Sequence, residues 1–112
     1  MSKNKSVIDI GSAAFDQQVL TSGLALVDFW AEWCGPCRTL GPIVETVASQ
    51  NEDTLQVFKV NVDEHPELAQ RYEIRGIPTL VLFQDGDLVD RIVGVQPAAA
   101  IQAIVDEHAA VA

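Results

Sequence analysis

The sequence predicts an α/β fold with a central mixed β-sheet of about five strands flanked by about four helices. Apolar runs of strand length alternate with segments of helical periodicity, an order that builds parallel crossovers within one sheet. The last two strands are joined by a short loop with an Asp-Gly pair, a strong signal for an antiparallel hairpin. A chain of 112 residues has the usual length of one domain, so we expect a single domain over residues 1–112.

The N-terminal part of the chain supplies a short strand, a helix and the first central strand. The short strand is predicted at residues 7–10. The helix follows at about 13–21, where Phe15 and Val19 stand four residues apart. Residues 24–30 form a near-continuous apolar run, typical of a strand buried on both faces of a parallel sheet. That run is therefore predicted to be the first central strand.

The middle of the chain continues the alternation with a helix, a strand and a second helix. Apolar residues recur at helical spacing over about residues 34–50, and Pro42 within that segment predicts a kink. Residues 55–62 are rich in valine and alternate well enough to form the next strand. A further helix is predicted to begin at Pro66, because proline suits a first helical turn. Its inward-facing residues are predicted to be Leu68, Ala69 and Tyr72.

The C-terminal part of the chain completes the sheet and adds the last helix. Strands are predicted at residues 79–83 and 88–93, joined by the turn at 84–87. The apolar stripe of the last helix consists of Ile101, Ile104 and Val105. The hairpin places an antiparallel pair of strands at the end of the sheet.

Charge and hydropathy exclude several classes of function. The chain has 7 Lys and Arg against 16 Asp and Glu, and its formal net charge of −9 repels phosphate backbones, so we expect no nucleic-acid partner. The longest uncharged run, residues 92–105, is shorter than the roughly 20 apolar residues of a spanning helix, so we expect no membrane span. Asp9 and Gly11 interrupt the apolar residues near the N-terminus, which argues against a secretory signal and favours a cytoplasmic location.

Two cysteines lie in the segment Trp33-Cys34-Gly35-Pro36-Cys37, where the first central strand ends and its helix begins. A reducing cytoplasm disfavours a structural disulfide, so the pair is a candidate for chemistry. Across a first helical turn the two residues lie on the same face of the helix. Their Cα atoms are then roughly 5.5 Å apart, a distance that suits a disulfide. The positive end of the helix is expected to lower the pKa of Cys34, which makes it the predicted nucleophile. Cys37, shielded by the helix and by Phe29 or Leu40, is the predicted resolving thiol.

The reaction that this pair predicts is thiol–disulfide exchange. Cys34 attacks a target disulfide, a mixed disulfide forms, and Cys37 displaces the reduced product, with no metal and no organic cofactor required. Two alternatives stay open: the cysteines are unreactive buried thiols, or they share a zinc ion with His65 and His108, at spacings unlike finger-type sites. Taken singly, His108 is predicted to be a solvated helix-end residue and His65 a loop residue.

Residues 27–37, Val-Asp-Phe-Trp-Ala-Glu-Trp-Cys-Gly-Pro-Cys, and residues 75–80, Arg-Gly-Ile-Pro-Thr-Leu, together resemble the thioredoxin family. The resemblance extends from about Val7 to Glu107 and implies the thioredoxin fold. It implies a reductant of protein disulfides whose partners are disulfide-containing client proteins and a separate thioredoxin reductase. That reductase is either an NADPH flavoprotein or a ferredoxin-linked enzyme.

Asp28 is the one ionisable residue in its apolar run, so burial is expected to raise its pKa. The resemblance implies that Asp28 relays a proton to or from Cys37 through water while that thiol attacks. It implies too that Lys59, on the neighbouring strand, is the partner of Asp28. The alternatives are a purely structural carboxylate, satisfied by Lys59 or by backbone N–H groups, and a Lys59 that is simply solvated.

The resemblance also implies a docking surface for client proteins around the cysteines. In the family the peptide bond between Ile77 and Pro78 is cis, which leaves the backbone of Ile77 free to pair with an extended client segment. Gly94 permits a close approach of that backbone. The residues of this apolar rim are Trp33, Ile77, Pro78, Val93 and Gly94.

Other residues near the motif receive structural roles or depart from the family pattern. Pro36 stiffens the dithiol and, by resemblance, favours the reducing role, while Gly35 avoids a steric block and Trp30 is assigned wholly to the core. Glu73 departs from the family pattern at its position. If it lies near Arg75 and the rim, its negative charge narrows the choice of partner proteins. The segment Thr39-Leu40-Gly41 is another departure, and its glycine costs the helix roughly 1 kcal/mol against alanine.

Two other functions compete with the reductant. One is an oxidant or isomerase on the same fold, which the Gly35-Pro36 dipeptide and the missing signal disfavour. The other is a redox-independent binding subunit, in which the apolar rim holds another protein and turnover is incidental. We expect a monomer, because the sequence shows no exposed heptad pattern and no long hydrophobic edge.

Overall fold

The computed structural model describes residues 6–109 of the chain. The elements are β1 (Val7–Asp9), α1 (Ser12–Gln18), β2 (Leu24–Trp30), α2 (Gly35–Gln50), β3 (Gln56–Asn61), α3 (Pro66–Arg71), β4 (Thr79–Gln84), β5 (Asp87–Val93) and α4 (Ala98–Ala109). Each predicted element is present, and the bounds differ by a few residues at the ends. Part of the segment used to argue against a secretory signal, residues 1–5, lies outside the described range. No helix within residues 6–109 combines the length and the apolar character needed to cross a lipid bilayer.

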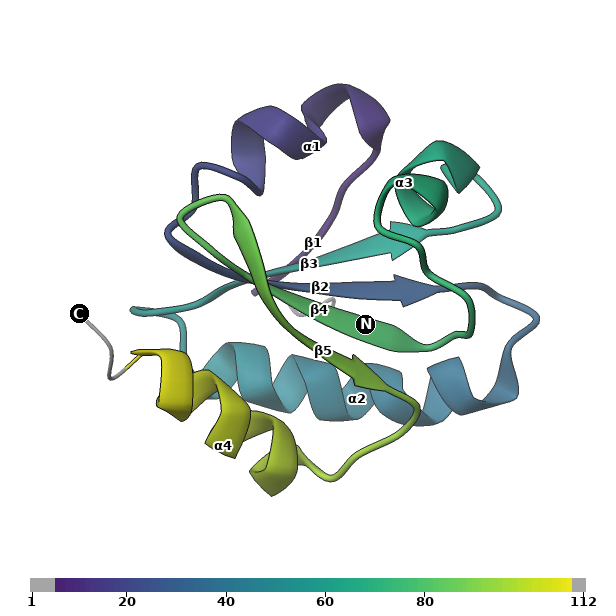
Figure 1. The fold of residues 1–112 in the computed structure, drawn as a ribbon. Helices are drawn as coiled ribbons and strands as arrows, with labels where there is room; N and C mark the ends of the chain where they lie inside the picture. The colour runs from purple at the N-terminus through teal and green to yellow at the C-terminus, as the bar shows by residue number, and fades with distance from the viewer. Residues whose placement is uncertain (1–5, 110–112) are drawn as a thin grey trace.

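The strands form one sheet in the order β1-β3-β2-β4-β5. β3 pairs in parallel with β1 and with β2, whereas β4 pairs antiparallel with β2 and with β5. Figure 1 shows α1 and α3 on one face of this sheet and α2 and α4 on the other. The structure therefore confirms the α/β class and the mixed sheet with helices on both faces.

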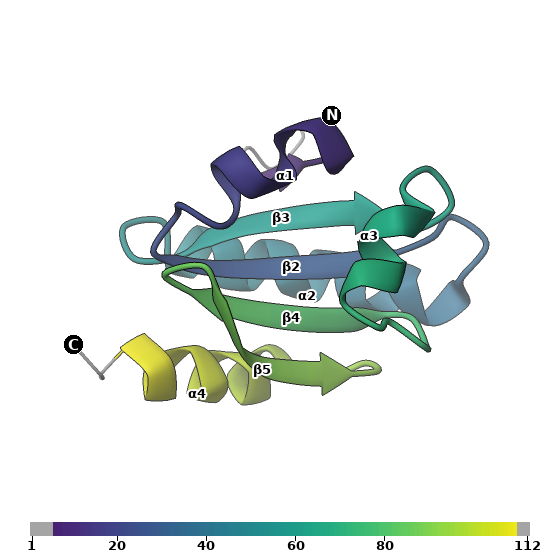
Figure 2. The same cartoon turned by 45° about the horizontal axis from the view of Figure 1, so that its top comes forward.

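The direction of β4 corrects one part of the prediction, which expects parallel crossovers up to the final hairpin. β4 runs antiparallel to β2, with Leu80 opposite Asp28. The six residues of α3 rise only about 9 Å. A strand of six residues, such as β3, spans about 20 Å. Since α3 cannot carry the chain back along the sheet, β4 starts near the end where β3 stops (Figure 2).

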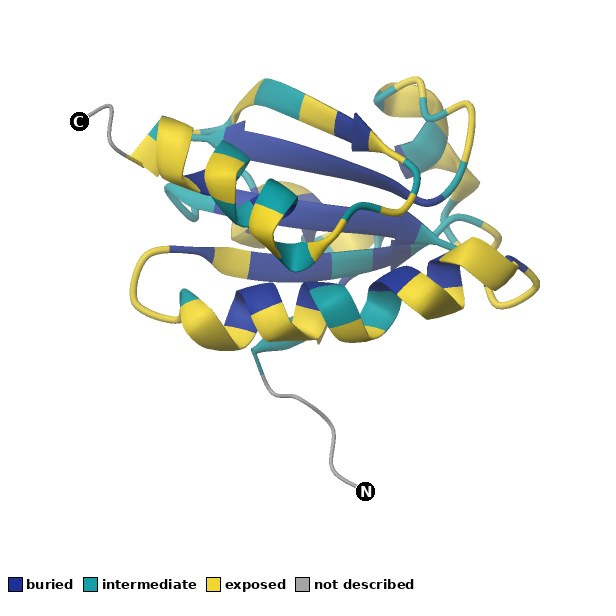
Figure 3. Cartoon of the chain, turned by 90° about the horizontal axis from the view of Figure 1, so that it is seen from below, coloured by how far each residue is buried: buried dark blue, intermediate teal, exposed yellow. Residues whose placement is uncertain are grey.

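Two apolar cores fill the space on the two faces of the sheet. The core beside α2 and α4 is aliphatic, with Leu26, Leu40, Val44, Val47, Val57, Leu80, Leu82, Ile92, Ile101 and Val105 among its buried residues. The core beside α1 and α3 is aromatic, and the centroid of the Phe15 ring lies 5.9 Å from that of Phe83 and 5.5 Å from that of Tyr72. Figure 3 shows the buried strands between helices whose outer faces are exposed. The sheet is thus held from both sides.

The hairpin of β4 and β5 confirms the prediction from the Asp-Gly pair. Asp85 and Gly86 both have positive φ, 52° and 90°, as a two-residue type I′ turn requires. Across the sheet, Thr79 of β4 stands between Phe29 of β2 and Val93 of β5. The end of β5 is therefore at the same end of the sheet as the segment that follows β2, which carries the cysteines.

Candidate redox-active site

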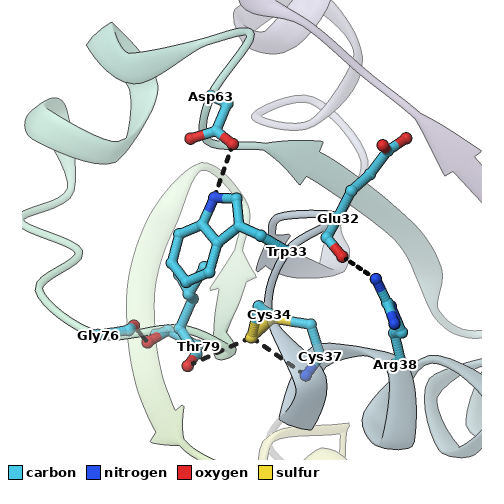
Figure 4. Close-up of a disulfide and its surroundings, with 9 residues drawn as sticks. Glu32, Trp33, Cys34, Cys37, Arg38, Asp63, Gly76 and Thr79 are labelled. Atoms are coloured by element: carbon cyan, nitrogen blue, oxygen red, sulfur yellow. Dashed lines mark hydrogen bonds between the residues drawn. A yellow bond between two sulfur atoms is a disulfide. The ribbon is translucent and has the colours of Figure 1, made fainter.

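The candidate site lies at the N-terminus of α2, just after β2 ends. Cys34 is the N-cap residue, with an extended backbone (φ −88°, ψ 109°), and Pro36 occupies the first helical turn. Cys34 and Cys37 form a disulfide with their Cα atoms 5.3 Å apart. The Cys37 N–H donates to Cys34 Sγ at 3.2 Å (Figure 4). The two cysteines thus face each other across one turn, as their spacing predicts.

Both cysteines are buried, with exposed fractions of 4% and 5%. The residues that cluster with them are Ala31, Trp30, Val62 and Ile77. The predicted shielding of Cys37 by Phe29 or Leu40 is wrong. Phe29 belongs to the aromatic core on the opposite face of β2, because successive side chains of a strand alternate, and Leu40 packs in the aliphatic core.

Asp28 is the buried carboxyl of the site. Its neighbours along β2, Val27 and Phe29, belong to the aromatic core, so Asp28 faces α2 on the other side of the sheet. The residue is only 4% exposed, and its Oδ1 finds no hydrogen-bond partner in the described part of the chain. Burial raises the pKa of Asp28 to about 7, although the charge of Lys59 acts in the opposite direction. The predicted rise of this pKa is confirmed.

A cavity of about 250 Å³, which we call the Asp28 cavity, lies beside this carboxyl. Its lining residues are Asp28, Trp30, Cys37, Arg38, Gly41 and Lys59. A water molecule takes about 30 Å³ in the liquid, so the space admits more than one. Because Asp28 and Cys37 line the same cavity, water in it can hydrogen-bond to both groups.

Lys59 is next to Asp28 in the register of β2 and β3, yet the two side chains form no ion pair among the described residues. Its Nζ lies 4.5 Å from the centroid of the Trp30 ring, a cation–π contact. The assignment of Trp30 wholly to the core is wrong, because this residue is half-buried and lines the Asp28 cavity. Trp30 is the last residue of β2, so it lies at the boundary between the core and the site.

Trp33 is prominently exposed beside Cys34, with 68% of its surface accessible. Its Nε1 donates a hydrogen bond of 2.8 Å to Asp63 Oδ2 (Figure 4). On the other side of the motif, Arg38 donates to the carbonyl oxygen of Glu32 at 2.7 Å. Sequence reasoning missed Asp63, although its place just after β3, at the same end of the sheet as Trp33, is a signal that could have found it.

The peptide bond between Ile77 and Pro78 is cis, as the family resemblance implies. Pro78 itself is buried, which corrects its place in the rim, whereas Val93 is 62% exposed and Ile77 is half-buried. The Ile77 carbonyl oxygen lies 3.8 Å from Cys34 Sγ, and no residue within 6–109 accepts a hydrogen bond from the Ile77 N–H. Gly94, with φ 89°, donates its N–H to the Pro78 carbonyl oxygen at 2.9 Å.

A groove of about 320 Å³ lies beside Trp33. Its lining residues are Trp33, Val62, Ala69, Ile74, Arg75, Gly76 and Ile77. Among these, Arg75 is the only one with a charged side chain. Glu73 is not among the residues that line this groove. The backbone of Glu73 has φ 55°, in the left-handed region that favours glycine.

Neither histidine lines the groove or the Asp28 cavity. His65 is in the loop before α3, as predicted, and is the N-cap residue of that helix. His108 Nε2 lies 3.2 Å from Asp90 Oδ2 and its side chain is 20% exposed, which corrects the expectation of a solvated residue. In the described range, no group of three or more His, Cys, Asp or Glu side chains is arranged to hold a metal ion.

Comparison with known proteins finds close relatives of this chain. A family model described as Thioredoxin matches residues 6–107. The chain is 48% identical over 100 residues to Thioredoxin 1 of Synechococcus elongatus, an alignment that covers 88% of this chain and 94% of that protein. It is 43% identical over 103 residues to Thioredoxin of Staphylococcus aureus, with coverage of 92% and 98%. These alignments extend over almost the full length of each relative.

Proposed function

The chain belongs to the thioredoxin family and is a protein-disulfide reductase, and on that premise we propose which residues carry the reaction. Cys34 attacks one sulfur of a client disulfide and releases the other as a thiolate. Cys37 then attacks Cys34, the mixed disulfide breaks, and the client leaves with both electrons while the two cysteines become a disulfide. The observation that carries this proposal is the Cys34–Cys37 pair, closed across the first turn of α2 beside an exposed Trp33.

The choice of Cys34 as the nucleophile rests on its surroundings. Its sulfur accepts a hydrogen bond of 3.2 Å from the Cys37 N–H and lies at the positive end of α2. Both the hydrogen bond and the helix dipole stabilise a thiolate. It also lies beside the Ile77 carbonyl oxygen, on the side where Trp33 is exposed. Cys37 lines the inner Asp28 cavity instead, which suits a thiol that acts second.

We assign the proton of Cys37 to Asp28. A pKa of about 7 lets this carboxylate accept a proton near neutral pH, and the shared cavity gives a water-mediated path from one group to the other. Lys59 supports the carboxylate by its charge without forming an ion pair with it. After the client has left, the protonated Asp28 returns its proton to solvent.

We propose that clients bind as extended segments across the apolar rim. The Ile77 N–H, which has no acceptor among residues 6–109, and the Ile77 carbonyl oxygen can pair with the backbone of a client, as in the addition of a strand to a sheet edge. Trp33 and Val93 supply exposed apolar contacts on the two sides of this backbone. The hydrogen bond between Gly94 and the buried Pro78 holds the backbone of Ile77 in place. Recognition then depends mostly on the client's backbone, so many client sequences are accepted.

Recycling requires a second enzyme. We propose that a separate reductase, either an NADPH flavoprotein or a ferredoxin-linked enzyme, returns two electrons to the disulfide at the same rim. Gly35 avoids a steric block beside the disulfide, and Pro36 in the first turn of α2 stiffens it. We further propose that the protein works as a cytoplasmic monomer of one domain, in keeping with its net charge of −9, because copies of the chain with the same charge repel one another.

Two single substitutions test the order of attack. We expect Cys34→Ser and Cys37→Ser both to lose turnover on a disulfide protein such as insulin. Only Cys37→Ser should accumulate a mixed disulfide, visible by mass spectrometry after acid quenching, because Cys34 still attacks and nothing resolves the product. Accumulation with Cys34→Ser instead would reverse the two roles. Function that survives Cys34→Ser/Cys37→Ser would assign the protein to redox-independent binding.

The reduction potential of the Cys34–Cys37 couple tests the direction of electron flow. It is measured by equilibrating the protein with dithiol buffers and following the fluorescence of Trp30 and Trp33. We expect a value more reducing than the glutathione pool, where each 30 mV corresponds to about 1.4 kcal/mol for a two-electron couple. A value well above that pool would replace the reductant with an oxidant.

A further inference from the structure

Gly41 is a glycine in the interior of α2, one turn after Cys37. Glycine is the poorest helix former after proline, so a helix interior normally excludes it unless space is needed. A Cβ at Gly41 would meet no neighbouring atom within 4 Å, and the backbone there does not adopt positive φ. Neither close packing nor backbone conformation therefore requires glycine at this position.

The space beside Gly41 is the Asp28 cavity. Side chains of a helix tilt toward its N-terminus, so a side chain at position 41 would lie over Cys37 and Arg38. These two residues and Gly41 supply the α2 wall of the cavity, and Asp28 and Lys59 line it from the sheet. A side chain at position 41 would therefore extend into the cavity that Cys37 and Asp28 also line.

The charged groups around the cavity leave this carboxyl accessible to water. From β3, Lys59 directs its Nζ at the Trp30 ring, and from α2, Arg38 donates to the Glu32 carbonyl oxygen. On β4 the residue opposite Asp28 is Leu80, which carries no charge. The Asp28 Oδ1 is left without a partner in the described residues, although it is buried. The cavity is thus a side from which water can reach it.

We propose that Gly41 keeps the water path to Asp28 open, and that the residue at position 41 thereby controls the rate of the resolving step. This inference rests on the proposed role of Asp28. As Cys37 attacks Cys34, its thiol proton passes through water to the Asp28 carboxylate, and the client departs as a thiolate. The neutral carboxyl then loses that proton to water past Gly41. Gly41 is a positioning residue, because it touches neither client nor sulfur and acts through Asp28.

The test compares Gly41→Ala and Gly41→Leu with the natural protein, with Thr39→Ala as the control on the exposed side of the same helix. Reduced protein is mixed with a peptide disulfide, and the decay of the mixed disulfide is followed by quenched-flow mass spectrometry over a range of pH. In parallel, the ¹³C signal of the Asp28 carboxyl is titrated by NMR. That titration reports on the carboxyl itself and is independent of turnover.

We expect resolution at pH 7 to slow two- to threefold with Gly41→Ala and about tenfold with Gly41→Leu, a part of the roughly 10²-fold or more that acid–base catalysis supplies. The Asp28 carboxyl should titrate at higher pH in both variants, because a side chain that displaces water desolvates it further. Alanine strengthens the helix, so Gly41→Ala should unfold at a higher temperature while it reacts more slowly. Thr39→Ala should change neither the rate nor the titration.

Three outcomes overturn the inference in distinguishable ways. If Asp28→Asn slows resolution but Gly41→Leu and Gly41→Ala alter neither rate nor titration, the water path is wrong and the role of Asp28 stands. If Asp28→Asn leaves resolution unchanged, the role of Asp28 fails and the inference falls with it. If Gly41→Ala slows the Asp28→Asn protein as much as the natural protein, position 41 does not act through Asp28.

Discussion

The disulfide has two surroundings that differ in exposure and in charge. The apolar rim presents Trp33 and Val93, which are 68% and 62% exposed. The Asp28 cavity holds a carboxyl that is 4% exposed and has no ion pair among the described residues. Exposed apolar side chains suit the binding of another protein, whereas a buried carboxyl with a pKa near 7 suits proton transfer. In the proposed function, binding and proton transfer therefore use separate residues that meet only at the cysteines.

The largest expected effect is on the free energy of unfolding, and it comes from Asp28 in the cavity. The unfolded chain releases the Asp28 proton with an ordinary pKa of 3.8, whereas the folded chain holds it until about pH 7. The folded state therefore binds more protons in this window, and its free energy of unfolding falls as the pH rises from about 4 to about 7. Asp28→Asn removes this loss, so its stability relative to the natural protein should rise by on the order of 4 kcal/mol between pH 4 and pH 8.

Denaturant titrations at the two pH values measure that difference, and the change with pH cancels any constant effect of the amide. The natural protein should lose stability across the window, and Asp28→Asn should lose less. Parallel pH dependence of the two proteins would show that the carboxyl ionises freely in the folded state.

The next effect is on the rate. Asp28→Asn should lower the rate of client reduction about 10²-fold at pH 7, since an amide cannot accept the Cys37 proton and general base catalysis typically contributes 10²- to 10⁴-fold. Stopped-flow kinetics with a disulfide peptide gives the rate. The affinity for an unreactive peptide should stay unchanged, because Asp28 does not reach the rim. A loss of affinity with an unchanged rate would contradict the division into two sides.

On the rim side, Trp33→Ala should reduce kcat/KM for a protein client by about tenfold, as expected when a well-placed aromatic contact is removed. The matched control is Leu88→Ala on β5, where another exposed apolar side chain lies outside the rim. Steady-state kinetics should show the loss for Trp33→Ala alone, with the pH dependence of the rate unaltered. Equal losses for the two variants would mean that general surface hydrophobicity, and not the rim, binds clients.

The smallest effect is expected at a residue outside both the apolar rim and the Asp28 cavity. His108→Ala breaks the contact with Asp90 and should lower the free energy of unfolding by less than about 1 kcal/mol, the usual range for a single pair near the surface. Thermal denaturation measures it, and client reduction should be unaffected. A change in activity would connect α4 to the site, although none of the described residues that line the site belongs to α4.

Much of the site could be predicted because its signals are local in the chain. The segment around Cys34 is predicted to lie where a strand ends and a helix begins, and in the structure Cys34 stands at the N-terminus of α2. Asp28 in an apolar run predicts a buried acid with a raised pKa, which the structure confirms. The Asp-Gly pair at 85–86 predicts the hairpin turn, and both residues adopt positive φ.

What could not be predicted depends on contacts between distant segments. Alternation along β2 does not say which face Phe29 takes, so its assignment beside Cys37 was wrong. The partner of Trp33, Asp63, lies 30 residues away. The direction of β4 was predictable in principle, since it follows from the shortness of α3, but it requires the length of that helix and not only its presence. The same holds for Gly41. The sequence shows that a glycine destabilises the helix at this position, but it does not show the cavity that Gly41 lines.

The separation of the two sides is tested most directly by the pH profile of client reduction for the natural protein, Asp28→Asn and Trp33→Ala. An inflection near pH 7, where Asp28 titrates, should appear in the natural protein and in Trp33→Ala, and it should vanish in Asp28→Asn. Trp33→Ala should only lower the whole curve. An inflection that survives in Asp28→Asn, or one that moves in Trp33→Ala, would contradict the assignment of proton transfer and binding to separate residues.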